Sequence, residues 1–133
     1  MYAILAAVFA SLTAVLAKVG LDGINSHLAT AIRTVVVLGL AWVMVFVAGA
    51  QRELPHLSRT NLTFLVLSGI CTGLSWLCYY RAIQLGPVSK VAPIDKLSVV
   101  LTIFLAAIFL QEPFTIKTAA GSLFLLIGIL IMI

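Results

Sequence analysis

Long apolar stretches separated by short polar connections make up most of this chain. Within each stretch the apolar residues follow one another without strict alternation, a pattern typical of buried or lipid-facing helices. A bilayer core of roughly 30 Å needs about 20 mainly apolar residues in a helix, and only helices or closed barrels satisfy their backbone polar groups in lipid. The pattern therefore predicts five transmembrane helices, at about residues 2–19, 30–50, 62–81, 91–110 and 116–133.

The connections are rich in residues that start and stop helices. They read "GLDGINSHL", "AQRELPHLSRTN", "IQLGPVSK" and "QEPFT", and none is long enough to hold a soluble domain. The first stretch begins at Tyr2 with no basic segment before it and no small-residue cleavage site after it, so we interpret it as a membrane span and not as a cleaved signal peptide,. We expect one transmembrane domain over residues 1–133.

Composition agrees with a membrane protein. Hydrophobic residues make up 63% of the 133 positions and charged residues 9%, whereas about a quarter of the residues of a soluble domain are charged. The net charge is +4, but the basic residues are scattered and flank the apolar stretches, which favours membrane anchoring over nucleic-acid binding.

The distribution of basic residues gives no firm membrane orientation. With an odd number of spans the two termini face opposite sides of the membrane. The counts on the two sides are close, and several of the residues lie near span ends, so the positive-inside rule does not decide. One side receives Arg52, Arg59 and Lys117, and the other receives Lys18, Arg33, Arg81, Lys90 and Lys96.

Enzyme and metal-site signatures are missing from the sequence. It has no phosphate-binding loop, no H-E-x-x-H, no G-x-S-x-G and no paired C-x-x-C,. His27 and His56 lie in successive connections, and we interpret them as loop residues. Cys71 and Cys78 are about 10 Å apart along one helix, too far for a disulfide,. The sequence predicts no enzyme, no metal and no cofactor.

Small residues indicate how the helices pack. Lipid supplies no hydrophobic drive between spans, so close helix contacts are made by Gly, Ala and Ser. A G-x-x-x-G pair, Gly69 and Gly73, lies in the third span, and Gly121 and Gly128 share one face of the fifth. These patterns predict a helix bundle and carry no function by themselves.

Polar residues inside two consecutive spans fall on single helix faces. At 100° per residue, each set spans only part of the helix circumference. Their hydroxyls either bond the carbonyls of the preceding turn or line one side of a polar cavity, and the alignment of two stripes favours the cavity. The sets are Ser68, Thr72, Ser75 and Tyr79 in the third span and Asp95, Ser98 and Thr102 in the fourth.

Three charges lie within or close to the spans. Asp and Lys each cost about 2.5 to 3.5 kcal/mol at the centre of an inserting helix, which the large apolar residues after Asp95 and Lys96 offset,. One interpretation puts Pro93 in the first helical turn, Asp95 at the positive end of the helix dipole and Lys96 snorkelling outward. The other makes Asp95 a substrate- or proton-coupling carboxylate facing a cavity, with Lys96 tuning its charge or joining a gate. Arg33 either snorkels to the interface or contacts substrate or Asp95.

The chain resembles a known transporter family over essentially its whole length. The run "SWLCYYRAIQLGPVSKVAPIDKLSVVLTIFLAAIFLQEPFTIKTAAGSLFLLIGILIMI" is similar to the last three helices of an EamA domain of the drug/metabolite transporter superfamily. "AVLAKVGLDGINSHLATAIRTVVV" resembles its first helix pair, including an arginine, here Arg33. The strongest features are "YYRAIQLGPVSKVAP" and Glu112 at the end of helix four. The family usually has Gly-Glu there, where this chain has Gln111-Glu112-Pro113, which affects the turn geometry.

The resemblance implies an all-α integral membrane protein in the cell (inner) membrane, crossing it several times. Most family members resemble two such five-helix domains fused head to tail, with the second inverted around a central cavity. This chain carries one EamA repeat, so the resemblance implies an antiparallel homodimer. Helix five would be peripheral, and helices one to four would face the cavity.

Two function classes follow. The favoured one is a secondary transporter of small organic metabolites that works by alternating access. The alternative is a non-transporting membrane subunit that docks on or stabilises another membrane protein. A transporter needs the charges of the fourth span, whereas a docking subunit needs mainly its outer small-residue faces. The candidate substrate-binding or coupling residues are Asp95, Lys96, Ser98, Thr102, Ser75, Tyr79 and Arg33.

The substrate is not fixed by the sequence. Basic residues outnumber acidic ones near the expected cavity mouths, which favours anionic or zwitterionic solutes. Asp95 suits a cation or a proton equally well.

Overall fold

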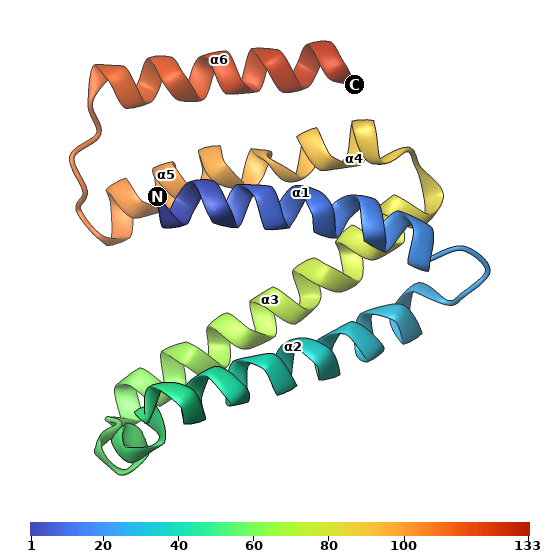
Figure 1. The fold of residues 1–133 in the computed structure, drawn as a ribbon. Coiled ribbons are helices and arrows are strands. Elements are labelled where there is room, and N and C mark those ends of the chain that lie inside the picture. The colour runs from blue at the N-terminus through green and yellow to red at the C-terminus, as the bar shows by residue number, and fades with distance from the viewer. The chain divides into compact units, whose positions relative to one another are not determined.

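The computed structural model describes residues 1–133 and contains helices joined by short connections (Figure 1). The elements are α1 (Tyr2–Gly20), α2 (Ser26–Ala48), the 3₁₀ helix η1 (Ala50–His56), α3 (Arg59–Leu85), α4 (Val88–Asp95), α5 (Leu97–Phe109) and α6 (Ile116–Met132).

Four helical segments are long and apolar enough to cross a membrane. They are α1, α2, α3 and the joined segment Val88–Phe109, which contains α4 and α5. The last helix, α6, has 17 residues and is therefore about 25 Å long, shorter than a typical bilayer core. The prediction of an all-helical, multi-pass membrane protein is confirmed, with four full-length spans and one shorter apolar helix.

Two helices are longer at their polar ends than the apolar pattern predicted. The second begins at Ser26 because the Asn25 side chain caps it, accepting a hydrogen bond from the His27 N–H at 2.8 Å,. His27, expected in a connection, therefore lies in the first turn of α2. The third runs from Arg59 to Leu85, which extends the predicted span 62–81 at both ends. Polar terminal turns carry no hydropathy signal, so the sequence pattern misses them.

The fourth apolar segment, predicted at about 91–110, is long enough to cross a membrane as Val88–Phe109, and its helix is broken at Lys96. It starts at Val88, and α4 ends at Asp95. The Lys96 N–H donates to the Pro93 carbonyl at 3.0 Å and the Val99 N–H donates to the Lys96 carbonyl at 3.0 Å, so the ladder tightens to a three-residue step there,. Pro93 has no N–H to continue the regular ladder. It lies well beyond the first turn of α4, which corrects the interpretation that placed it in the first turn.

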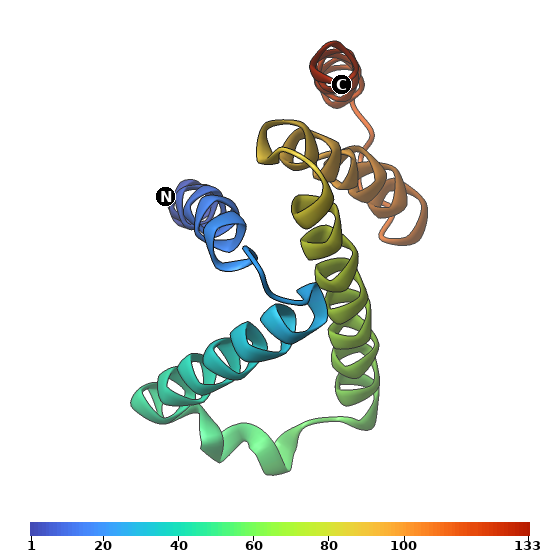
Figure 2. The same cartoon turned by 90° about the vertical axis from the view of Figure 1, so that its right-hand side faces the viewer.

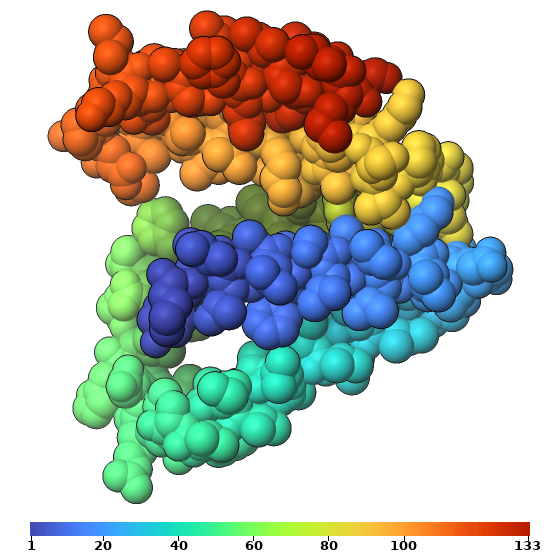
Figure 3. Space-filling view, turned by 45° about the horizontal axis from the view of Figure 1, so that its top comes forward, coloured from blue at the N-terminus to red at the C-terminus, as the bar shows by residue number.

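The chain forms two compact units. The first contains Met1–Val15 and Leu85–Ile133, and the second contains Leu16–Gln84. In the first unit α6 packs along α4 and α5, as Figure 3 shows for the red and orange segments. In the second unit α2 leads into η1, and α2 and α3 diverge toward η1 (Figure 2).

Few side chains are buried within the chain, and large apolar side chains are exposed along every α helix except α4, where only Ile94 is clearly exposed. Lipid is the solvent that such surfaces fit. Most of the buried residues belong to the second unit, around the α1–α2 connection and the last turns of α3. The buried residues are Ala14, Leu21, Ser26, Thr30, Tyr80, Ile83 and Ile129.

The glycines predicted to mediate helix packing contact no other helix of their own unit. A Cβ placed on Gly69, Gly73, Gly121 or Gly128 meets no atom within 4 Å. Helix packing through these faces therefore stays a prediction.

Candidate functional site

The first polar feature is an ion pair at the break in the fourth span. Lys96 Nζ lies 3.3 Å from Asp95 Oδ2, and 36% of the Asp95 side chain is exposed. Asp95 lies about 10 Å along the span from Val88 at 1.5 Å per residue,. Adjacent residues on a regular helix point about 100° apart and do not face each other, yet here the long lysine side chain reaches back across the break. Each charge offsets the other in an otherwise apolar segment.

Ser98 and Thr102 follow the break on α5. Both are exposed, and they share a helix face because they are four residues apart. The ideal-helix projection from Asp95 to this pair crosses the break at Lys96, so the common face of all three residues stays a prediction.

The polar stripe of the third span is part of the second unit. Thr72 Oγ1 donates to the Ser68 carbonyl at 2.9 Å, which is the local bond that competes with a cavity role. Ser75 is exposed and Tyr79 is half-buried. The two stripes belong to different units, so their shared cavity also stays a prediction.

Arg33 on α2 lies against two aromatic rings of α3. Its guanidinium carbon is 4.7 Å from the centroid of the Trp76 ring and 5.2 Å from that of Tyr80. Trp76 and Tyr80 are four residues apart and therefore share one helix face. Such contacts contribute about 0.5 to 2 kcal/mol each. The Tyr79 ring meets Tyr80 edge-on, with centroids 6.0 Å apart.

Hydrogen bonds join the α1–α2 connection to the last turns of α3 in the second unit. Lys18 Nζ donates to the Ile83 carbonyl at 2.7 Å. Gln84 Nε2 donates to the Ile24 carbonyl at 2.7 Å, and Gln84 Oε1 accepts from Arg81 at 2.8 Å. These bonds hold the α1–α2 connection and the end of α3 together, which positions the aromatic face that meets Arg33.

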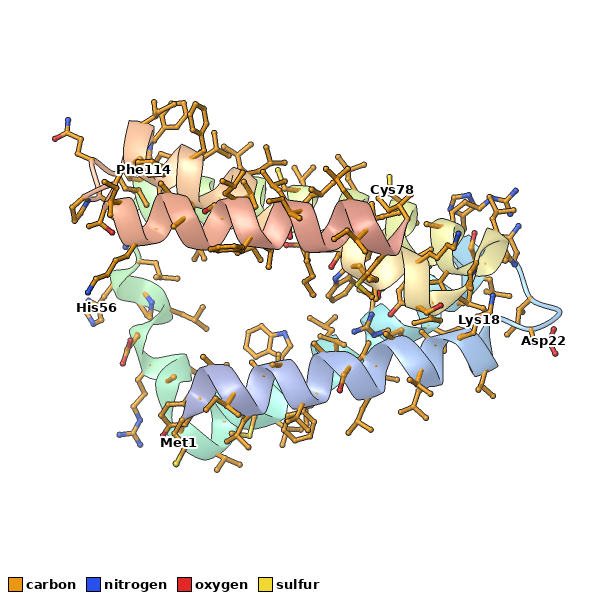
Figure 4. The ribbon with its side chains drawn as sticks, turned by 90° about the horizontal axis from the view of Figure 1, so that it is seen from above. Met1, Lys18, Asp22, His56, Cys78 and Phe114 are labelled. Atoms are coloured by element: carbon orange, nitrogen blue, oxygen red, sulfur yellow. The ribbon has the colours of Figure 1, made fainter.

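A cavity of about 450 Å³ opens beside these bonds. Figure 4 labels Lys18 at the end of α1 and Asp22 on the connection that follows. The cavity is lined by Lys18, Val19, Leu21, Asp22, Gly23 and Gln84. Lys18 and Asp22 give this lining one basic and one acidic side chain.

Sequence reasoning found Arg33 but missed Trp76 and Tyr80. Their four-residue spacing was visible, yet only the approach of α2 to α3 shows that their common face meets the arginine. Elsewhere, no three His, Cys, Asp or Glu side chains come together as metal ligands, and Cys71 and Cys78 are free.

The whole chain, residues 1–133, matches the model of the EamA-like transporter family. The chain belongs to this family. It is 43% identical over 131 residues to an uncharacterized transporter from the cobO 3' region of a Sinorhizobium species, an alignment that covers 98% of this chain and 93% of the relative. It is also 28% identical over 71 residues to an uncharacterized protein of Methanocaldococcus jannaschii, covering 53% of this chain and 52% of that protein. No solved structure matches.

The family and the Sinorhizobium relative together support a transporter role in the membrane. The family match also points away from an enzyme.

Proposed function

We propose that this chain is a secondary transporter of small organic metabolites that works by alternating access. The observation that carries the proposal is the charged break in the fourth span, where Asp95 and Lys96 pair at 3.3 Å within an apolar segment. Broken helices in transporters bring irregular backbone and charges to the substrate path. A charge placed within a span is costly, so its presence there points to a functional site.

Asp95 is the proposed coupling group. When a proton or a substrate cation neutralises its carboxylate, the attraction that holds Lys96 at 3.3 Å is lost,. Lys96 is then free to swing outward, while the residues of α5 turn relative to α4 about the break. Ser98 and Thr102, the exposed hydroxyl pair of α5, supply hydrogen-bonding groups next to this hinge.

The proposed working unit is an antiparallel homodimer in the cell membrane. One copy has a single repeat, and a second, inverted copy would complete the cavity that family members build from two repeats. Two observations support this. The basic residues are nearly balanced between the two sides, as insertion in both orientations requires,. The alignment covers 93% of the Sinorhizobium relative, so that relative consists largely of one such domain.

Orientation is tested by labelling. Cys71 and Cys78 are replaced by alanine, one new cysteine replaces Gln51, and a second variant carries it in place of Gln111 instead. In cells, a membrane-impermeant maleimide is expected to label about half of the molecules at each position. Labelling of all molecules from one side only, in a preparation with full transport activity, contradicts the antiparallel dimer.

The function is tested by ligand binding and by flux. A metabolite panel is screened by thermal shift on purified protein, since a ligand that binds the folded state raises its stability by RT ln(1 + [L]/Kd). Solutes that bind are then assayed for counterflow in proteoliposomes. Saturable flux that Asp95→Asn abolishes supports the transporter. If Asp95→Asn has no effect while changes on the outer glycine faces abolish function, the chain is a docking subunit instead.

A further inference from the structure

The Arg33 cluster of the second unit contains two polar groups that the chain itself does not satisfy. The guanidinium carbon of Arg33 lies over the Trp76 and Tyr80 rings, and no hydrogen bond or ion pair joins Arg33 to another side chain of the second unit. The Tyr80 hydroxyl is buried without a hydrogen-bond partner, and the residue is 2% exposed. Both groups belong to one contact.

The hydrogen-bond donors of the arginine are left unused by these ring contacts. A guanidinium has five N–H donors in a planar fork. This fork matches a carboxylate, which accepts two parallel hydrogen bonds from it. A phenol hydroxyl such as that of Tyr80 can donate a further hydrogen bond to the same acceptor. The cluster therefore offers hydrogen-bond donors, and a ligand that carries hydrogen-bond acceptors would satisfy them.

The second unit supplies no counter-charge for Arg33. Its two acidic residues, Asp22 and Glu53, form no ion pair with Arg33, and Asp95 of the first unit is paired with Lys96. An arginine in a membrane-spanning helix with no anion beside it is costly, whereas a bound anion removes that cost.

We infer that Arg33, Trp76 and Tyr80 form a binding site for a small organic monocarboxylate. One positive charge balances one negative charge, so a doubly charged phosphate would leave excess charge in the apolar span. Trp76 and Tyr80 present apolar ring surface to the organic part of the ligand. The inference rests on the proposed transport function, for which it names the substrate class. Since the Tyr80 hydroxyl is buried, the site accepts ligand when the contact between α2 and α3 opens.

The test uses the fluorescence of Trp76 in purified, detergent-solubilised protein. Trp42→Phe removes the other tryptophan, so the signal reports the cluster alone. The probes are propionate, pyruvate and benzoate, with their amides, inorganic phosphate and choline as comparisons. We expect a saturable change with at least one monocarboxylate, and weaker or no change with its amide, phosphate and choline. Saturation by none of the three, or equal binding of amide and acid, overturns the site.

Variants of the cluster locate the binding. Arg33→Gln is expected to weaken the monocarboxylate about tenfold or more, and Tyr80→Phe by several-fold. Arg59→Gln is the matched control because it removes the same charge from the exposed start of α3, at the opposite end of that helix from the cluster, and affinity is expected to change less than about twofold. If Arg33→Gln does not fold, Arg33→Lys replaces it and is also expected to bind more weakly, because the planar fork is lost. Parental affinity in the folded Arg33 variant overturns the site.

Flux measurements separate this inference from the transport proposal. Saturable binding at the cluster with no counterflow in proteoliposomes contradicts transport and leaves the site intact. Counterflow that is unchanged in the Arg33 and Tyr80 variants contradicts the site and leaves transport intact.

Discussion

Gln111, in the connection between α5 and α6, has a backbone conformation that suits glycine. Its φ is +54°, the one positive φ of a non-glycine residue in the chain. The Leu110 and Glu112 N–H groups both donate to the Ala106 carbonyl, at 2.9 and 3.3 Å, so the turn that follows α5 depends on this conformation. A side chain in the left-handed region costs about 1 to 2 kcal/mol.

Gln111→Gly is therefore expected to stabilise the folded chain. Glycine removes the left-handed cost but loses about 0.5 to 1 kcal/mol more conformational freedom on folding. The net gain is about 0.5 to 1 kcal/mol, a two- to fivefold change in the unfolding equilibrium. The Gln111 side chain is exposed, so its removal subtracts little.

Reversible unfolding by sodium dodecyl sulfate in mixed micelles, followed by circular dichroism, measures this gain. Gln111→Ala is the first control, because alanine keeps the left-handed cost, and it is expected to match the parent. Leu110→Gly is the second: Leu110 is 70% exposed and has a φ of −98°, so glycine there is expected to destabilise. The reasoning is refuted if Gln111→Gly is no more stable than Gln111→Ala.

Three further substitutions test other parts of the account. Asp95→Asn keeps the shape of the side chain and removes the charge that pairs with Lys96, so we expect a folded, inserted protein without coupled flux; flux at the parental rate across a range of pH contradicts this role. Arg33→Lys keeps the charge but loses the planar fork, and is expected to fold normally and to lower flux; unchanged flux favours snorkelling. Asn25→Ala removes the cap on α2, where Asn25 accepts from the His27 N–H, and should lower the free energy of unfolding by about 1 kcal/mol; Asn61→Ala, whose side chain caps no helix, is the comparison.

The membrane class of the fold could be predicted from the sequence because hydropathy over 20 residues is a local property. The break at Lys96 could not, since Pro93 alone is compatible with either a kink or a helix start,. The turn at Gln111 could be predicted in part. The family pattern expected glycine there, and the positive φ supplies the physical reason for that preference,.

The candidate site was predicted only in part, because contacts between helices depend on how they approach. Arg33 was identified from its charge within an apolar stretch. Its aromatic partners, Trp76 and Tyr80, were not, since an aromatic pair at four-residue spacing is common on any apolar helix face and only the meeting of α2 and α3 selects it. Conversely, Thr72 was grouped with a cavity stripe, yet its hydroxyl bonds the Ser68 carbonyl on its own helix,.

The central claim is that the chain moves small organic solutes across a membrane by itself. Counterflow in proteoliposomes that contain only this purified protein tests it directly, with a panel of labelled monocarboxylates, amines and neutral metabolites. The account predicts saturable flux of at least one solute, above the rate in protein-free liposomes, and loss of that flux in Asp95→Asn. Flux at the protein-free rate for every solute, from protein shown to be folded and inserted in both orientations, would contradict it.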